Sequence, residues 1–301
     1  MTHAIAHNER TTGLLLPAVL LGGLLALFGA QIGLVPLPAF GDAMLGPTTV
    51  TIEPRTYAYR APGDFLRGPA SVDGPSLTIV DPQSLEIMKY QVSAADFALC
   101  VADGRCREAE PRRRGEGNVP ATGVSFEDAT DYARWLSDTS GETWRLPRVA
   151  EWVFAAGSKA GDPALITETD SADPAERWLA DYEREAARGA SVIATPEPLG
   201  AFGENEFGVA DLAESVWEWT STCGSRTTLG ANGEQISYIE ACGVRLLEGR
   251  HRTPMSVFIR DARTGGCSVA APPDNLGFRL VRDRAWWSHV LSDAAQFLHL
   301  A

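Results

Sequence analysis

The sequence predicts a loop-rich α+β domain behind one N-terminal membrane-spanning helix. Glycine (29 residues) and proline (19) are plentiful, which favours short elements joined by loops over a helical bundle. With 45% apolar residues, a chain of 301 residues can bury a full core. Residues 11–41 carry no charged side chain, and Leu14–Val35 is long enough to cross a bilayer as a helix. The net charge of −13 disfavours binding to nucleic acid.

The N-terminal segment favours an uncleaved anchor. We expect residues 1–12 in the cytoplasm, 13–36 as the transmembrane anchor and 37–54 as a linker, with the body of the chain in the periplasm of a single-pass inner-membrane protein. A cleaved signal peptide is the alternative. The triplet 41–43, Gly-Asp-Ala, fits a small-x-small cleavage site but lies late, and Phe28 breaks that pattern directly after the apolar core.

The five cysteines agree with an oxidising compartment. Cys100 and Cys106 enclose a short loop that a disulfide could close, and their spacing fits no common zinc pattern. Cys223, Cys242 and Cys267 then form one pair and one odd thiol. Which two of them pair stays open at this point.

The first half of the body predicts a linker, two strands and a helix. Residues 42–75 lack helical periodicity and run as a linker into an early strand. Ser76–Val80 and Leu85–Tyr90 are typical of strands. Ser93 can cap a helix over Ala94–Ala102.

The clearest helix of the chain follows Ser125. This serine is a good N-cap with Asp128 three residues on, and Gly141 follows the helix end. Pro147 opens a second helix. One more helix is expected near Pro174–Arg188, within a long polar excursion.

The body of the chain is organised around Gly203–Thr220. Asn205 and the carbonyl groups around Gly208 are hard oxygen donors in a turn that glycine allows, and such donors suit Ca²⁺. The run Trp217–Trp219 alternates aromatic and acidic residues, as on a short strand with one buried face. The alternative is an aromatic core strand that a loop enters.

Four stretches, in order, resemble the formylglycine-generating enzyme family, also called sulfatase-modifying factors. They are residues 85–104, 119–156, 205–220 and 275–279. The resemblance covers residues 55–284 and implies one compact α+β domain of the C-type-lectin-like kind. The tail at 285–301 is predicted as an amphipathic helix that docks on the domain or, alternatively, touches the headgroup zone of the membrane.

The resemblance also implies a Ca²⁺ site in the turn before the tryptophan strand. Relatives that bind Ca²⁺ use an asparagine side chain and backbone carbonyl groups there. These positions fall on Asn205, Glu206, Gly208 and Ala210.

The chemistry of the family's oxidases depends on two nearby cysteines that hold Cu(I), a soft ion suited to thiolates. The nearest positions in this chain hold Glu248 and either Met255 or Ser256. The histidine cluster of other, iron-dependent relatives is absent from the sequence as well. The resemblance therefore implies a domain without the oxidase cysteine pair. The alternative is an enzyme with a rearranged cysteine site, for which the candidate catalytic residues are Cys242, Cys267 and Cys223.

The stretch at 242–267 replaces that oxidase site and is rich in arginine. Clustered guanidinium groups can receive an anionic ligand or the carboxylates of a partner protein, or they can tie loops down by internal salt bridges. The expected binding surface consists of Arg245, Glu248, Arg250, His251, Arg252, Arg260 and Arg263. His251 and Met255 also offer a pair of ligands that suits copper.

The sequence thus predicts a periplasmic accessory domain that binds or matures a redox or copper enzyme. Within the family, the 242–267 stretch looks most like accessory proteins found beside copper nitrite reductases in denitrifying bacteria. A nitrite reductase is therefore the expected partner, and the rival interpretation is a formylglycine-generating-type oxidase or another thiol-dependent enzyme.

Overall fold

The computed structural model describes four ranges and three isolated helical positions, namely 46–80, 83–161, 195–264 and 275–283, with residues 176, 179 and 183. The chain divides into two units, 1–46 and 47–301, and all described residues except Gly46 belong to the second. Within these ranges no helix has the length and apolar character needed to span a bilayer. The expected anchor, the C-terminal helix and Cys267 lie outside the described residues.

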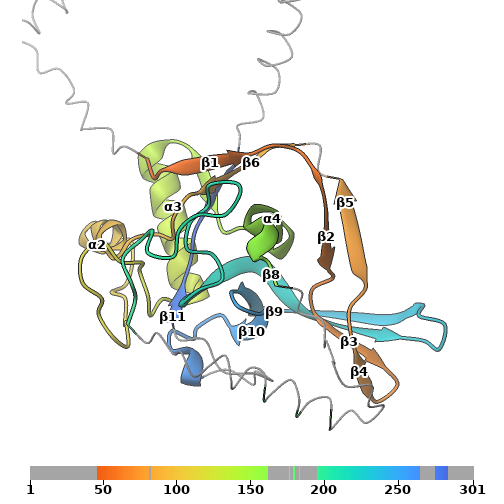
Figure 1. The fold of residues 1–301 in the computed structure, drawn as a ribbon. Helices are drawn as coiled ribbons and strands as arrows, with labels where there is room; N and C mark the ends of the chain where they lie inside the picture. Colours follow the sequence, from red (N-terminus) through yellow and green to blue (C-terminus); the bar gives the residue numbers. More distant parts are fainter. Residues whose placement is uncertain are drawn as a thin grey trace, which may run out of the picture. The chain divides into compact units, whose positions relative to one another are not determined.

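Three sheets form the framework (Figure 1). The largest has the order β10-β9-β8-β3-β4, with β11 added beside β8. Its strands are β3 (Asp64–Arg67), β4 (Ala70–Val72), β8 (Val216–Leu229), β9 (Gln235–Glu248), β10 (Thr253–Ser256) and β11 (Asn275–Gly277). A second sheet has the order β1-β6-β12-β7 and comprises β1 (Thr49–Ile52), β6 (Leu85–Met88), β7 (Thr143–Arg145) and β12 (Val281–Asp283). The third pairs β2 (Thr56–Arg60) with β5 (Ser76–Val80).

The expected linker is partly folded. Strand β1 lies inside the predicted linker 37–54, and it pairs antiparallel with β6. Its residue Ile52 is buried in the same apolar cluster as Trp152. The prediction failed because β1 is short and its apolar residues are separated by threonines, so it resembles linker composition. The domain therefore begins before residue 55.

Three of the predicted helices are confirmed, whereas the helix expected near Pro174–Arg188 lies outside the described residues except at positions 176, 179 and 183. The confirmed helices are α2 (Ala94–Ala102), α3 (Phe126–Ser140) and α4 (Val149–Ala156). Ser93 caps α2 through the backbone N–H of Asp96, and Gly141 ends α3 with a left-handed φ of 73°. Two 3₁₀ turns, Gly157–Lys159 and Ala262–Thr264, complete the described helical segments.

The long hairpin of β8 and β9 links the core to the surface. The first part of β8, from Val216 to Thr220, is buried at every residue, so the prediction of a strand with one buried face was wrong here. Its far part continues outward with β9 as a ribbon, which we call the arm: residues 224–229 and 235–241 with the turn between them (Figure 1). The chain therefore places its most buried and some of its most exposed residues on one pair of strands.

The N-terminus of α3 carries a buried ionic cap. Ser125 and Asp128 form a reciprocal capping box, and the Asp128 carboxylate also accepts both Nε and Nη2 of Arg260 at 2.7 Å. Burial alone would raise the pKa of Asp128, but the hydrogen bonds from Arg260 and Ser125 outweigh it and hold that pKa below its usual value. This carboxylate thus stabilises the fold in its charged form.

We predict that Asp128→Asn lowers the free energy of unfolding by about 3 kcal/mol at neutral pH, because it leaves Arg260 without its buried partner. The folded-state pKa is depressed, so the stabilisation is present above the unfolded pKa and is lost as pH falls through the folded value. Urea titrations of both proteins at several pH values should show the difference shrinking below about pH 4. A difference that is independent of pH would contradict this assignment.

Candidate functional site

A buried ion pair marks the centre of the domain. Glu218 on β8 and Arg279 are both fully buried, and two hydrogen bonds of 2.7 Å join them. Gln91 Nε2 and Trp152 Nε1 each donate to the Glu218 carboxylate at 2.8 Å. Arg279 Nη2 also donates to the carbonyl oxygen of Ala210 at 2.9 Å. One carboxylate therefore holds β8, α4 and the loop that precedes β8 in fixed positions.

The predicted Ca²⁺ turn is closed by its own hydrogen bonds. Asn205 Oδ1 accepts from the backbone N–H groups of Phe207 and Val209 at 3.1 and 3.0 Å. Its Nδ2 donates to the carbonyl oxygens of Ala155 and Ala156 at 2.7 and 3.0 Å. Both ends of the amide are thus used to dock the turn on the end of α4.

The other predicted Ca²⁺ ligands point to different partners. The Glu206 carboxylate accepts from the N–H and hydroxyl groups of Ser158 at 2.7 Å, which lowers its pKa, and the Ala210 carbonyl receives Arg279. Gly208 has a φ of 83°, so glycine is needed there for the backbone. Of the four predicted Ca²⁺ ligands, the Asn205 side chain and the Ala210 carbonyl thus already have hydrogen-bond partners within the protein.

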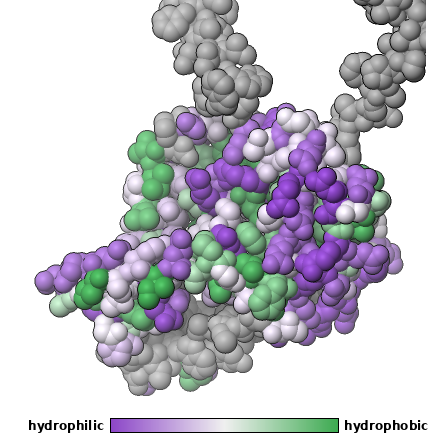
Figure 2. Space-filling model, turned by 180° about the vertical axis from the view of Figure 1, so that it is seen from behind, coloured by the Kyte–Doolittle hydropathy of each residue, from purple (hydrophilic) through white to green (hydrophobic). Residues whose placement is uncertain are grey.

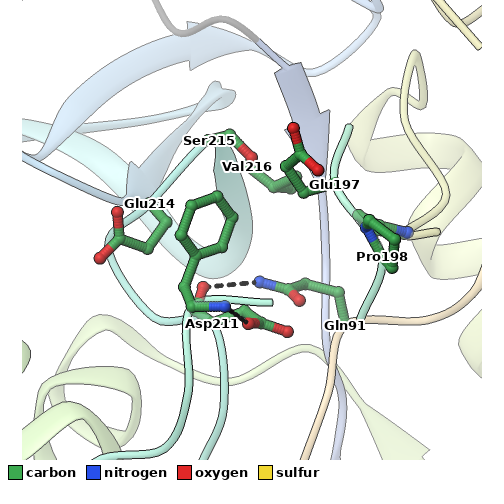
Figure 3. Close-up of a pocket in the computed structure, with 9 residues that line it drawn as sticks. Gln91, Glu197, Pro198, Asp211, Glu214, Ser215 and Val216 are labelled. Atoms are coloured by element: carbon green, nitrogen blue, oxygen red, sulfur yellow. Dashed lines mark hydrogen bonds between the residues drawn. The ribbon is translucent and has the colours of Figure 1, made fainter. Parts of the chain in front are cut away.

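A small cavity lies beside this turn (Figure 3). Asp211 lines it with a carboxylate that accepts the N–H groups of Gly200 and Phe202 at 2.5 and 2.9 Å. Gln91 lines it too, and its Oε1 has no hydrogen-bond partner among the described residues. With about 10 Å³, the cavity has room for one water or one ion. The cavity is therefore lined by an oxygen without a hydrogen-bond partner among the described residues, Gln91 Oε1, whereas Asn205 Oδ1 in the neighbouring turn accepts two hydrogen bonds.

The predicted arginine surface is divided by internal ion pairs. Arg252 Nε contacts Glu248 Oε1 at 2.5 Å, and only 8% and 6% of the two side chains are exposed. Burial raises the pKa of Glu248, and the Arg252 charge opposes that rise. Arg260 is committed to Asp128 and Glu110. The prediction of one binding surface was therefore wrong for these residues: they tie loops together, which is the alternative that the sequence left open.

The remaining members of that set are separated. Arg245 donates to the Ser221 carbonyl and lies over the Phe126 ring at 4.5 Å, while Arg263 is exposed on a 3₁₀ turn. Arg250 is half-buried, and His251 packs edge-on against Trp217 with ring centroids 4.2 Å apart.

The cysteines form two disulfides. The predicted Cys100–Cys106 bridge is confirmed, and a second bridge joins Cys223 to Cys242 across β8 and β9. The sulfurs of this second pair lie near the Glu240 carboxylate in the one described cluster with metal-ligand spacing, but as a disulfide they offer no thiolate. Met255 is buried in the core, so copper binding through His251 and Met255 gains no support from the described geometry.

A groove of about 350 Å³ lies beside strand β2. Strand β2, the end of α4 and the loop after β9 surround it, and its lining includes Arg55, Tyr57, Tyr59, Arg60, Arg252 and Glu206. The rings of Tyr57 and Tyr59 stack at 5.9 Å. Arg55 lies over Phe154 at 4.5 Å and over Phe207 at 4.4 Å. Its Nε is buried without a hydrogen-bond partner among the described residues.

Sequence reasoning missed most of this groove because residues 42–75 were expected to run as a linker into an early strand, and the position of that strand was not assigned. The available signal was the alternation in Thr56–Arg60, where two tyrosines at i and i+2 predict a strand with one aromatic face. Only Arg252 and Glu206 of the lining were singled out from the sequence, each for a different role.

Comparison with known proteins places this geometry in a family. Residues 42–284 match the model of the sulfatase-modifying factor enzyme 1-like domain. The chain belongs to the sulfatase-modifying factor family. It is similar to the formylglycine-generating enzyme of Mycobacterium tuberculosis (34% identical over 110 residues; 34% of this chain and 33% of the relative). It also resembles that of Streptomyces coelicolor (30% over 181 residues; 56% and 54%). The chain thus spans about half or less of these relatives.

A solved structure supports the fold of this family member. The structure of PvdO from Pseudomonas aeruginosa has a TM-score of 0.50 at 21% identity, and the match covers 79% of this chain and 95% of that one. The two positions that resemblance assigns to the oxidase cysteines hold Glu248, buried against Arg252, and either Met255 or Ser256. The family fold is therefore shown, and these two positions carry no sulfur pair.

We predict that Asn205→Ala destabilises the protein equally with and without Ca²⁺. The variant loses four hydrogen bonds that dock the turn on α4, so unfolding should cost about 2 to 4 kcal/mol less. Thermal melts of both proteins with added Ca²⁺ and with a chelator provide the measurement. If the Tm difference appears only in Ca²⁺, the amide is an ion ligand after all.

We predict that Arg252→Met lowers the free energy of unfolding by about 3 to 5 kcal/mol, because Glu248 is left buried without a cation. Burial raises the pKa of Glu248, and loss of the Arg252 charge raises it further, so folding requires protonation of this carboxyl. Protonation costs more as pH increases, so the defect should be larger at about pH 8 than at about pH 5. Adding Glu248→Gln should recover most of the loss. Failure of the double variant to regain stability would contradict the pairing.

Proposed function

We propose that this sulfatase-modifying-factor-type domain is a partner-binding accessory protein whose groove holds an extended, carboxylate-bearing segment of another protein. The observation that carries this proposal is the groove lining, in which two stacked tyrosines lie beside Arg55 and Arg60. Tyrosine faces supply rigid contact area, and guanidinium groups recognise carboxylates through paired donors.

The charge of the groove supports an acidic segment as its occupant. The protein carries a net charge of −13, yet the groove lining holds one carboxylate, Glu206, against Arg55 and Arg60. The third arginine of the lining, Arg252, is paired with Glu248. Arg60 Nη1 donates to the Gly74 carbonyl at 2.8 Å, and Arg252 Nη1 donates to the Arg60 carbonyl at 3.0 Å. These bonds hold the groove wall in place before binding, which reduces the entropy lost when a partner is ordered.

Binding is favoured over oxidation of a substrate cysteine at the position used by the family's oxidases. Glu248 is engaged by Arg252 and Met255 is packed in the core, so neither position supplies a soft ligand for Cu(I). A formylglycine-generating-type oxidase in this chain would need its cysteines elsewhere.

The proposed setting is the outer side of the bacterial inner membrane. Two disulfides in the described residues agree with an oxidising compartment, and the apolar segment 13–36 provides the proposed anchor. We place the partner among redox or copper enzymes such as a nitrite reductase, which is the context that resemblance of the 242–267 stretch implies. Accessory work at such an enzyme would consist of holding it during maturation.

We predict that Ser76→Glu abolishes capture of the partner while the fold stays intact. Ser76 is an exposed residue of β5 in the groove lining, so a carboxylate there adds repulsion toward an acidic segment at little cost in stability. Tagged full-length protein purified from membranes, followed by quantitative mass spectrometry, measures the captured partner.

Ser71→Glu provides the matched control, because Ser71 is an exposed serine of β4 and is not part of the groove lining. This variant should capture the partner normally and melt like the wild type. Equal capture by the Ser76 and Ser71 variants would overturn the role of the groove. Loss of capture in both would show that net charge, and not the groove, governs association.

A further inference from the structure

The Cys223–Cys242 bridge differs from Cys100–Cys106 in its surroundings. The Cys100–Cys106 bridge lies in the hydrophobic core, with Cys100 at 0% and Cys106 at 8% exposure. Cys223 is half-buried, whereas Cys242 is exposed at the base of the arm. Thiol–disulfide exchange requires a line of approach to one sulfur, so only the second bridge can be attacked in the folded protein.

The backbone presents Cys242 through an irregularity of the hairpin. Cys223 pairs with Arg245 and the next residue, Gly224, pairs with Ala241, so three residues of β9 bulge between two paired positions. Bulges re-aim side chains and are over-represented next to active sites. Cys242 is the first residue of this bulge, and Cys223 lies between two register shifts of the β8–β9 pairing.

The nearest charged group differs between the two sulfurs, although the Glu240 carboxylate lies within 4.8 Å of both. Arg245 Nη1 is 2.9 Å from Cys223 Sγ, and its guanidinium is held there by the Ser221 carbonyl and the Phe126 ring. Glu240 Oε2 is 3.7 Å from Cys242 Sγ. A neighbouring cation stabilises a thiolate and a neighbouring carboxylate destabilises one. Negative charge released by opening the bridge is therefore favoured on Cys223 and disfavoured on Cys242.

The arm offers a place for a polypeptide next to this sulfur. Ile236 and Ile239 are 66% and 62% exposed, and hydrophobic residues show along the arm in Figure 2. No described strand pairs with the outer edge of β9 between residues 235 and 243, because β10 begins its pairing at Val244. An extended segment can add to such an edge through main-chain hydrogen bonds.

We propose that the Cys223–Cys242 pair is a thiol–disulfide exchange site for a partner polypeptide that carries two cysteines near basic residues. The partner's thiolate forms a bond to Cys242 Sγ, the Cys242–Cys223 bond breaks, and its electron pair goes to Cys223 Sγ beside Arg245. The partner's second thiolate then attacks the partner sulfur of the mixed disulfide and releases Cys242, which takes up a proton.

The exchange balances without another reagent. The partner dithiol loses two electrons and two protons and becomes a disulfide, while the protein's disulfide becomes two thiols. The reverse sequence, with a partner disulfide, restores the starting state. Glu240 disfavours an anionic attacking thiol and favours one with a positive charge nearby, which is why the partner cysteines are assigned a basic neighbourhood. This site is separate from the groove, so it does not depend on the proposed groove binding.

The test uses the oxidised protein with three small thiols as probes: cysteamine, 2-mercaptoethanol and 3-mercaptopropionate. After acid quenching and alkylation, peptide mass mapping gives the rate at which each bridge opens and the cysteine that carries the mixed disulfide. We expect the adduct on Cys242 and not on Cys223, and opening of this bridge at least about tenfold faster than opening of Cys100–Cys106. Adducts on both cysteines alike, or equal opening of the two bridges, would overturn the proposal.

Variants separate the electrostatic roles from stability. Arg245→Met should slow opening about tenfold by removing the cation beside the leaving thiolate, and Arg245→Lys should retain most of the rate. Arg226→Met, which removes an exposed arginine of the arm, is the matched control and should leave the rate unchanged.

Glu240→Gln should reduce the preference for cysteamine over 3-mercaptopropionate. This last measurement stands even if the Arg245 variants fold poorly, and an unchanged preference would contradict the assignment of Glu240.

Discussion

The fold depends on one desolvated charge pair, Glu218 with Arg279. Each charge would be very costly to bury alone, and the arrangement is stable because every acceptor site of the carboxylate meets a donor. The pair also forms hydrogen bonds with segments that are distant in the sequence, including α4 and the loop that carries Ala210. Its geometry therefore fixes where the loops around the groove and the small cavity can lie.

Local signals in the sequence predicted the helices well. Ser93, Ser125 and Gly141 act as caps because their side chains or backbone conformations satisfy groups at helix ends, and those groups depend only on near neighbours. The strands β5 and β6 were predicted from their apolar runs, although each pairs with a distant strand. Strand β1 was missed because its four residues alternate threonine with apolar residues and resemble a linker.

Residues whose role depends on distant partners were predicted less well. Asn205 has the residue type of an oxygen ligand, but its amide is consumed by the carbonyl groups at the end of α4. Arg252 and Arg260 have the composition of a binding surface, and buried carboxylates claim them. Only the sequence separation of Cys100 and Cys106 was short enough for its bridge to be expected from the chain itself, whereas the Cys223–Cys242 pairing required the β8–β9 hairpin.

The second bridge has a mechanical consequence for the arm. Strand β9 is an edge strand there, and a shift of one residue along β8 would turn each of its side chains to the opposite face. The bulge beside Cys242 is where such a slip would start, because three residues already lack regular pairing. The covalent link between Cys223 and Cys242 prevents β9 from shifting along β8. Reduction of these two sulfur atoms would remove that restraint on the register, and with it the covalent link that fixes which apolar residues the arm presents.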